Sequence, residues 1–359
     1  MMTSKGRIAW SMLLCAVIGL IGCSNDKASH KLAYGDPDKI DVAVVTGGHG
    51  FHPEEFFALF QGQDDLRCVE VPLTDDSEVF EDISEWNYDV VMLYNMTQNI
   101  SQKRQDNFIR LLKDKGIGVV VVHHAQAAYQ SWLEYHQIIG TAYIYFDVEI
   151  DGKLWPHCKC KGNEDIAVSI RDDKHPITRG MKDFTIHDET YKGRRWLEGN
   201  HVLLTTDHPE NDEPVAWTRQ YGRSRIFNIQ FGHDEKAYTG LEYRELIIRG
   251  ILWTAGAANV AAKPRVELRQ TSNAIDVTVD GTLFTSYLYQ LDPAKPLAAE
   301  DVMFTKPVFF PLRTPSGITV TRGWPFEQVE GESQDHPHHM GLYFTYDQPE
   351  GNNFWNNSA

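Results

Sequence analysis

The sequence is short of positive charge, of cysteine, and of apolar runs long enough to cross a membrane. Among its 359 residues, 34 lysines and arginines stand against 50 aspartates and glutamates, a formal net charge of −16. Nucleic-acid backbones are bound by basic surfaces, so this balance argues against a nucleic-acid partner. Hydrophobic residues make up 42% of the chain and charged residues 23%, which is typical of a globular protein with room for two domains.

Two common catalytic signatures are also missing. The glycine-rich stretch TGGHGFH, residues 46–52, does not continue into Lys-Ser or Lys-Thr, so it is not a P-loop, and its glycines lack the dinucleotide-binding spacing. No Gly-x-Ser-x-Gly elbow of a serine hydrolase occurs either. What remains is a polar pocket suited to acid–base chemistry, or to a divalent metal ion held by imidazole and carboxylate.

The five cysteines cannot form a complete disulfide framework. Cys15 lies in the N-terminal leader and Cys23 is predicted to carry a lipid, so Cys68, Cys158 and Cys160 remain, an odd number that cannot be fully paired within the chain. The stretch HCKC, residues 157–160, offers two thiols and one imidazole, which is too few for a zinc site. We interpret it as a hairpin with incidental thiols, and a soft-metal site is the alternative.

The N-terminus has the features of a bacterial lipoprotein signal. Lys5 and Arg7 precede an apolar run that is too short for a transmembrane helix and that ends in LIGC, with Cys23 as its last residue. We predict a signal peptide over residues 1–22, a lipid on the thiol of Cys23, and a polar tether over residues 23–38. The protein would then be anchored to a membrane of the bacterial cell envelope through that lipid. A secretory signal with a chance cysteine is the alternative.

Residues 39–255 alternate strand and helix patterns. Apolar runs such as DVAVV, VVML and GVVVV indicate strands buried on both faces, and SQKRQDNFIRLLKDKG, residues 101–116, indicates an amphipathic helix between two of them. Buried strands separated by helices predict a parallel sheet covered on both sides. The expected fold class is α/β, a flavodoxin-like doubly wound parallel sheet, with a late hairpin that turns at Tyr221-Gly222.

A small-residue linker, residues 256–264, precedes a segment with a different pattern. Residues 265–359 alternate apolar and polar side chains, turn at Asp280-Gly281, and show no helical period. They predict a second, all-β domain. Because the sequence ends at NNFWNNSA with no closing element, we expect this domain to be incomplete.

Unusual polar residues follow the predicted strands, where ligands bind in doubly wound sheets. Four such places lie far apart in the sequence: His49 with His52, His123 with His124, HDETY at residues 187–191, and FGHD at residues 231–234. We expect HDETY in a loop and the other three directly after strands, so that all four meet at one edge of the sheet. Neighbouring strand residues point in opposite directions, so only one of His123 and His124 is expected to face the site.

These stretches carry a resemblance to the ThuA family of trehalose-utilisation proteins. VVTGGHGFH, GVVVVHHA, HDETY and RIFNIQFGHD match that family's pattern in order across residues 41–255. The family is similar in fold to class I glutamine amidotransferases, whose nucleophilic cysteine stands at a strand–helix elbow. The corresponding stretch here, VVHHAQ, has no Cys or Ser, so a Cys-dependent glutaminase mechanism is not expected. The resemblance implies a role in bacterial sugar catabolism, including the catabolism of oxidised (3-keto) disaccharides.

The second segment resembles the PmoA-like family in KPVFFPLRTPSGITVTRGWPF and DHPHHMGLYFTYDQPEGNNFW. Its distinctive part is a cluster of candidate metal or sugar ligands within one loop: Asp335, His336, His338 and His339. The alternative for this cluster is a turn with hydrogen-bonded imidazoles. Met340 stands where we expect an arginine in that family, which puts the activity of this segment in doubt.

The first functional hypothesis is a carbohydrate-processing enzyme that acts on a glycoside or an oxidised sugar by acid–base or metal-assisted chemistry. Proton abstraction beside a carbonyl group needs a base and an electrophile but no covalent nucleophile. We expect Glu189 or His124 to be the general base, with Asp188 as a further catalytic residue. Substrate contacts are expected from Gly47, Gly48, His49, His52, Tyr191 and His233. Candidate ligands for a divalent metal ion are His49, His124 and His233.

The second hypothesis is a non-catalytic carbohydrate-binding or scaffolding lipoprotein. Aromatic side chains would then provide stacking surfaces, with four tryptophans as candidates: Trp132, Trp155, Trp196 and Trp217. A carboxylate and an imidazole within reach of each other would favour catalysis. Exposed aromatics and dispersed histidines would favour binding alone.

Overall fold

A computed structural model of the protein describes residues 39–343, except for residues 75, 293, 299–303, 305, 315 and 338. The predicted signal peptide, Cys23, the tether and His338 therefore lie outside the described residues. No helix in the described part is long and apolar enough to span a membrane.

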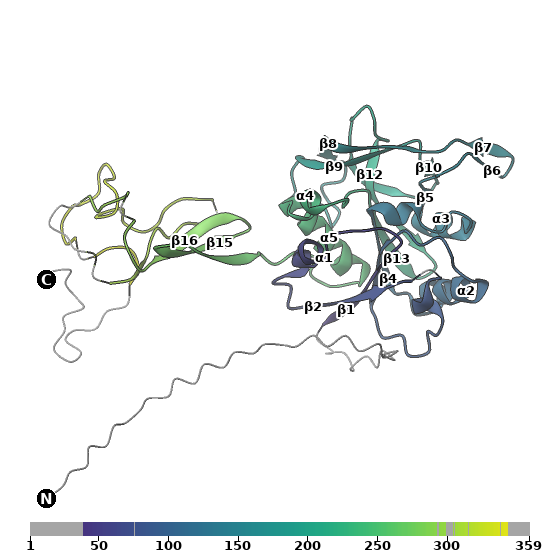
Figure 1. Ribbon diagram of the computed structural model, residues 1–359, viewed down its shortest axis with the longest axis horizontal. Helices are drawn as coiled ribbons and strands as arrows, with labels where there is room; N and C mark the ends of the chain where they lie inside the picture. Colours follow the sequence, from purple (N-terminus) through teal and green to yellow (C-terminus); the bar gives the residue numbers. More distant parts are fainter. Residues whose placement is uncertain are drawn as a thin grey trace, which may run out of the picture. The chain divides into compact units, whose positions relative to one another are not determined.

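A nine-stranded mixed sheet forms the α/β part (Figure 1). Five neighbouring strands are parallel, and four more continue the sheet in antiparallel fashion. In sheet order the strands are β2 (Leu66–Pro72), β1 (Ile40–Gly47), β3 (Val90–Asn95), β4 (Gly118–Val122), β13 (Ser224–Ile229), β12 (Pro214–Tyr221), β11 (His201–Thr205), β8 (Lys159–Ile170) and β9 (Phe184–Lys192). The prediction of a parallel sheet thus applies to the first five strands only. The predicted hairpin is the β12–β13 pair.

Helices cover both faces of the parallel strands (Figure 1). Consecutive strand residues point to opposite faces, so Val44 belongs to one hydrophobic core and Val45 to the other. The core that contains Val44 receives side chains from α1 (Pro53–Phe57), α4 (Glu235–Tyr238) and α5 (Leu241–Thr254). The core that contains Val45 receives side chains from α2 (Gln102–Arg110) and α3 (Leu133–Ile139). Apolar strands therefore lie buried between two helical layers, as their unbroken valine runs predict.

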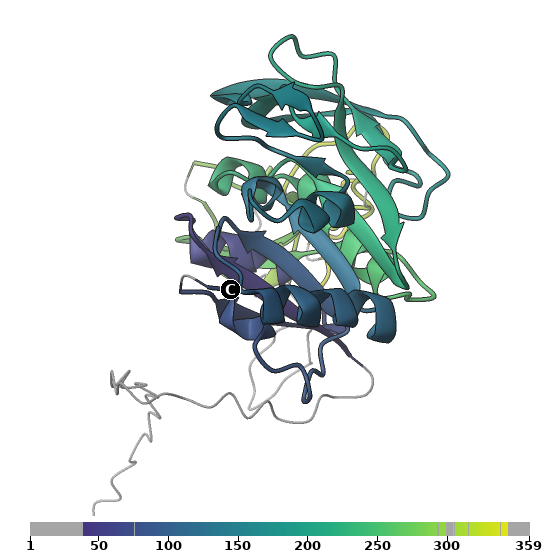
Figure 2. The same cartoon turned by 90° about the vertical axis from the view of Figure 1, so that its right-hand side faces the viewer.

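The strand order reverses between β1 and β3. β1 pairs with β2 on one side and with β3 on the other, and from β3 the sheet continues through β4 to β13. In open α/β sheets a crevice forms where the order reverses, outside the carboxyl ends of the strands. In Figure 2 the parallel strands of purple and blue colour and the antiparallel teal strands occupy opposite ends of the α/β part.

The HDETY stretch lies within β9, not in a loop as predicted. Ile186, Asp188 and Thr190 alternate along this strand as buried residues, Glu189 is partly exposed, and Tyr191 is buried as well. Two of the three alternating buried residues are polar, so the period of two does not appear in the hydropathy of the sequence. Because β9 pairs with β8 at the edge of the sheet, its side chains reach the rim from outside the parallel strands.

Short elements complete the α/β part. Two small antiparallel pairs lie between α3 and β11: β5 (Thr141–Ala142) with β10 (Arg195–Trp196), and β6 (Val148–Ile150) with β7 (Lys153–Trp155). Single helical turns are η1 (Ala58–Phe60), η2 (Glu78–Phe80), η3 (Leu111–Lys115) and η4 (His123–Ala127).

The second segment forms an antiparallel sheet of its own, in agreement with the all-β prediction. Its strands, in order, are β14 (Val266–Gln270), β15 (Ala274–Val279), β16 (Thr282–Leu288) and β17 (Val308–Phe309). The predicted turn joins β15 to β16 through Asp280 and Gly281, whose φ angles are 48° and 74°. Two successive positive φ angles are typical of the tight hairpin turn that Asp-Gly favours.

Candidate active site

A cavity of about 170 Å³ lies at the carboxyl ends of the parallel strands. It is lined by His49, Met96, His123, His124, Ala127, Tyr143, Tyr145, Cys160, Glu189 and Tyr191. His49 follows β1, Met96 follows β3 and the two neighbouring histidines follow β4, whereas Cys160 belongs to β8 and Glu189 to β9. The parallel strands and the antiparallel edge thus build the cavity together.

Both histidines of the pair after β4 border the cavity, whereas only one of them was predicted to do so. His123 has a φ of 50°, a left-handed conformation that is uncommon for a residue with a side chain. This turn ends the strand and removes the strict alternation of side chains that holds within it. His123 is therefore a site residue that the sequence-based choice of His124 missed.

Glu189 lies between two imidazoles. One of its carboxylate oxygens, Oε2, is 3.6 Å from Nε2 of His123, and the other, Oε1, is 3.5 Å from Nε2 of His233. Burial alone would raise the pKa of Glu189, but the neighbouring imidazoles, first that of His123, outweigh burial and lower it. Burial likewise opposes a charged His123, yet Glu189 and the buried Asp188 raise the pKa of that imidazole. Carboxylate and imidazole thus stabilise each other as an ion pair.

The two imidazoles beside Glu189 are themselves oriented by other groups. Nδ1 of His123 is 2.8 Å from the carbonyl oxygen of Gln230, and the hydroxyl of Tyr191 is 3.1 Å from Nε2 of His123. Nδ1 of His233 is 3.5 Å from the carboxylate of Asp234. Metal-binding histidines are commonly held in this way, with one ring nitrogen fixed by a carbonyl or carboxylate and the other directed at the ion.

The metal-ligand set differs from the predicted one. Among the described residues, the group whose ligand atoms lie close enough to hold an ion consists of His123, Glu189 and His233, with all atoms within 4.8 Å of one another. The prediction named His49 and His124 in place of His123 and Glu189. His49 directs Nδ1 at the carbonyl oxygen of Gly50, 2.7 Å away, so only His233 is common to both sets.

His124 is a buried, neutral imidazole. Its Nε2 lies 3.2 Å from the carbonyl oxygen of Tyr94, and its ring stacks on that of His49 with 4.5 Å between the centroids. Burial, followed by the neighbouring imidazoles, lowers the pKa of His124 well below its ordinary value. Its Nδ1 is buried with no hydrogen-bond partner among the described residues. The lowered pKa keeps His124 neutral and weakens it as a base.

Asp188 lies beneath the cavity and does not line it, although the sequence suggested a catalytic role. Its carboxylate accepts hydrogen bonds from the backbone N–H groups of Gly232 (2.6 Å) and His233 (3.3 Å). Burial raises the pKa of Asp188 despite these bonds and the nearby charge of His123. Asp188 thus holds the turn that carries His233, and it does not line the cavity.

The predicted binding residues of the first turn have different roles. Gly47 and Gly48 have φ angles of 126° and 75°, and a Cβ on either would lie within 2.7 Å of neighbouring backbone atoms. These glycines therefore allow the chain itself to pack closely, and neither of them lines the cavity. His52 points instead at Glu235 of α4, with 3.3 Å between Nε2 and Oε2, and does not line the cavity.

Cys160 is a second site residue that the sequence reading missed. It pairs with Tyr191 across β8 and β9, which places both side chains on the cavity side. Cys158, two residues earlier, is buried, and its thiol donates to the carbonyl oxygen of Gly193 (3.2 Å). Cys160 lies opposite Tyr191, a predicted substrate-binding residue, only because HDETY forms a strand that pairs with β8. The expectation of a loop at HDETY concealed this neighbour.

The second predicted cluster does not form a group of three ligands within the described residues. Asp335 lies 2.7 Å from Nδ1 of His336, and the rings of His336 and His339 stack at 5.2 Å. The three side chains are exposed. His338 lies outside the described residues, so the full DHPHH cluster stays a prediction.

Comparison with known proteins identifies the larger part of the chain. Residues 41–254 match the family model ThuA, described as trehalose utilisation. The chain belongs to the ThuA family. Residues 274–359 match a second model, DUF6807, a family of unknown function. The PmoA-like resemblance of that segment is not confirmed by this match.

Solved structures resemble the chain at low identity. A ThuA-like protein from Parabacteroides merdae is 21% identical with a TM-score of 0.53, and the match covers 71% of this chain and all of that one, which shows a shared fold. A GH42 β-galactosidase from G. stearothermophilus (TM-score 0.40, 12% identity, 70% of this chain and 36% of that one) and PurLQS from Thermotoga maritima (TM-score 0.39, 13% identity, 60% and 98%) are more distant, and likenesses this low carry no argument. No curated protein matches the chain.

Proposed function

We propose that this ThuA-family chain is a carbohydrate-processing enzyme whose active site is the cavity around Glu189. The observation that carries the proposal is the carboxylate set between two imidazoles, 3.6 Å from His123 and 3.5 Å from His233. A base and an acid side by side in a cavity are the minimum for acid–base catalysis. The description of the family, trehalose utilisation, supports carbohydrate as the substrate class.

The chemistry that suits these groups is elimination from an oxidised (3-keto) glycoside. Glu189, ionised because its pKa is lowered, takes the proton from the carbon between the keto group and the anomeric carbon. The electron pair of that C–H bond forms a C=C bond to the anomeric carbon, while the bond from the anomeric carbon to the glycosidic oxygen breaks. The leaving sugar takes a proton from the imidazolium of His123, whose pKa is raised. This route needs no Cys or Ser nucleophile at the turn after β4.

A divalent metal ion would also suit the three side chains. With Nδ1 of His123 donating to Gln230, the lone pair of Nε2 is directed at the same space as Glu189 and Nε2 of His233. Two imidazoles and one carboxylate are a common ligand set for zinc and for iron. Such an ion would polarise the keto oxygen of the substrate.

A purely sugar-binding role has less support. Of the four tryptophans considered as stacking surfaces, Trp132 and Trp217 are buried. Trp196 is exposed but packs edge-on against Trp217 with 4.9 Å between the centroids, and the ring of the partly exposed Trp155 is covered by the side chains of Lys153 and Arg195. Four histidines, His49, His123, His124 and His233, gather in one place, and two of them contact the Glu189 carboxylate. This arrangement favours catalysis over a binding platform.

We also infer the finer assignments that follow from the sequence. The order β2-β1-β3-β4-β13 supports a flavodoxin-like unit, and by resemblance a class I glutamine amidotransferase-like one. The PmoA-like assignment of residues 265–359 rests on resemblance alone. The LIGC sequence supports lipidation of Cys23 and a location in the bacterial cell envelope.

The test is turnover of a 3-keto disaccharide, followed by NMR in D₂O so that both product and hydrogen exchange beside the keto group are observed. Replacing Glu189 by Gln removes the base and is expected to lower the rate by about 10²-fold or more. Glu164→Gln is the matched control, because Glu164 lies on the neighbouring strand β8 with similar exposure but pairs with Lys161 and His208 outside the cavity. Equal rates in the two variants would overturn the proposal.

The same assay with and without EDTA distinguishes the metal-free acid–base mechanism from the metal-assisted one. If activity survives EDTA, Glu189 and His123 carry out the reaction without a metal ion. Activity that EDTA abolishes and added Zn²⁺ restores assigns carbonyl polarisation to a metal ion. In that case His233→Gln is expected to lower the bound metal measured by mass spectrometry.

A further inference from the structure

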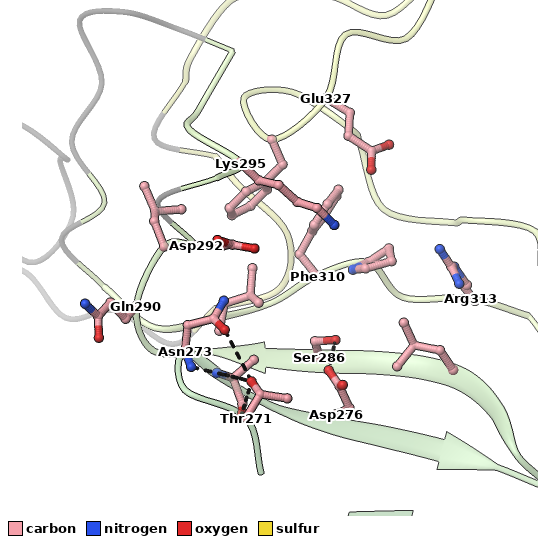
Figure 3. A pocket seen from close by; sticks show the side chains of 16 residues that line it. Thr271, Asn273, Asp276, Ser286, Gln290, Asp292, Lys295, Phe310, Arg313 and Glu327 are labelled. Atoms are coloured by element: carbon pink, nitrogen blue, oxygen red, sulfur yellow. Dashed lines mark hydrogen bonds between the residues drawn. The ribbon is translucent and has the colours of Figure 1, made fainter. Parts of the chain in front are cut away.

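A second and larger cavity lies in the all-β part of the chain. Its volume is about 420 Å³, against about 170 Å³ for the candidate active site. Small-molecule sites have volumes of roughly 300–1,000 Å³, so a ligand the size of a sugar could fit. Figure 3 shows Asp276 and Ser286 rising from the strands, and Asp292, Lys295 and Glu327 coming from the loops that face them.

The strand side of the cavity is a fixed polar wall. Asp276 on β15 and Ser286 on β16 stand opposite each other in the register, and the hydroxyl of Ser286 donates to the Asp276 carboxylate at 2.6 Å. That bond uses one carboxylate oxygen of Asp276 and leaves the other as an acceptor. The wall is therefore preorganised and needs no rearrangement to receive a donor.

The loop side brings charges of both signs that do not neutralise one another. Lys295, Arg313 and Glu327 border the same cavity, yet none of them forms an ion pair within the described part of the chain. The Nε of Arg313 is buried and has no hydrogen-bond partner among the described residues. Buried donors are normally satisfied, so an unpaired guanidinium nitrogen beside a cavity marks a place for a ligand or for water.

An aromatic pair closes the cavity on its apolar side. Phe310 and Phe326 stack with 4.4 Å between their centroids, and both line the cavity. The Phe310 ring is buried, which makes this wall rigid. Aromatic surface beside a few oriented polar groups is the usual composition of a small-molecule site.

We propose that this cavity binds a neutral sugar. Its ionisable groups are three carboxylates and two cations: Asp276, Asp292, Glu327, Lys295 and Arg313. A hydroxyl group can donate to a carboxylate at one position and accept from a guanidinium at the next, and a sugar carries a hydroxyl on most of its carbons. An anionic ligand would be repelled by the three carboxylates, and a cationic ligand by the lysine and the arginine. The sugar's C–H surface would lie against the Phe310–Phe326 pair.

The experiment is isothermal titration calorimetry of the full chain with trehalose and with glucose. Arg313→Gln removes a charged donor and is expected to weaken sugar binding about tenfold, since a hydrogen bond to a charged group contributes about 1.5–3 kcal/mol. Lys295→Gln, at an exposed position where folding is not at risk, is expected to weaken it in the same direction. Arg269→Gln is the matched control, because Arg269 lies on β14 opposite Asp276 in the register but does not line the cavity.

The outcomes also separate this site from the candidate active site. Unchanged sugar affinity in both the Arg313 and Lys295 variants overturns the proposal, as does the absence of any heat with either sugar at millimolar concentration. Loss of binding in Glu189→Gln with none in Arg313→Gln would place the sugar in the active-site cavity instead. Binding of glycylglycine without binding of sugar would show a site for a zwitterion. If Glu189→Gln stops turnover but leaves this binding intact, both proposals stand independently.

Discussion

His123 adopts a left-handed backbone conformation, which costs of order 1–3 kcal/mol for a residue that carries a side chain. Contacts from distant strands hold it there: the carbonyl oxygen of Gln230 follows β13, and the hydroxyl of Tyr191 comes from β9. The strained turn places His123 against Glu189, where the mutual effect on their pKa values favours a charged pair. Strain of this kind concentrates where function requires a fixed geometry.

His136 shows how burial makes the stability of a protein depend on pH. Its imidazole is fully buried in α3, and the guanidinium of Arg195 donates to its Nδ1 at 3.3 Å. Burial, followed by the charge of Arg195, lowers the pKa of His136 to about 4. The folded state therefore resists a proton that the unfolded chain accepts near pH 6.5.

We predict that His136 removes stability as the pH falls from about 6.5 to about 4. Because the pKa of His136 is depressed in the folded state, its contribution to the free energy of unfolding is fully present above pH 6.5. Between pH 6.5 and pH 4 that free energy falls by about 3 kcal/mol, at 1.36 kcal/mol per pKa unit. Urea unfolding of the wild type and of His136→Gln across this range measures it. The free energy of unfolding should fall less steeply with acid in the variant, and equal slopes would contradict the prediction.

At the scale of elements, the backbone of the turn after β1 is constrained because the chain segments that leave β1, β2 and β3 approach one another closely. Gly48 lies against the chain that leaves β3, where a Cβ would be 2.7 Å from the carbonyl carbon of Met96. Gly50, two residues on, has open space around it. The glycine-rich sequence thus contains two positions set by backbone packing, Gly47 and Gly48, and one, Gly50, with open space around it.

We predict that Gly48→Ala destabilises the fold and Gly50→Ala does not. Gly48 combines a φ of 75° with a close backbone contact, so alanine there is expected to cost about 1–3 kcal/mol. Alanine at Gly50 should change the free energy of unfolding by no more than about 0.5 kcal/mol. Chemical denaturation of the two variants provides the comparison, and equal losses of stability would contradict the prediction.

At the scale of the whole molecule, the antiparallel edge completes the site that the parallel strands begin. β8 and β9 lie beyond β11 in the sheet, yet they supply Cys160, Glu189 and Tyr191 to a cavity whose histidines follow β1 and β4. The parallel half of the sheet supplies the crevice, and the antiparallel edge supplies its carboxylate. Neither part alone would hold an acid beside a base.

We also predict that the protein is held at a membrane by the lipid on Cys23. Cys23→Ser removes the thiol that the lipid would modify, so the protein is expected to move from the membrane fraction to the soluble one after cell fractionation. Cys68→Ser is the control, because Cys68 belongs to β2 within the fold. An unchanged distribution in the Cys23 variant would contradict lipidation at this residue.

Local patterns alone determined much of this chain. Valine runs such as that of β4 predicted buried strands, the Asp280-Gly281 turn predicted a hairpin, and His49 was correctly expected at a strand end, because each depends on residues close in sequence. Only the tertiary structure decided that HDETY is a strand, that Asp188 is buried beneath the site, and that His123 and Cys160 border the cavity. These features depend on contacts between β4, β8, β9 and β13, and no local period records which distant strand a polar residue will meet.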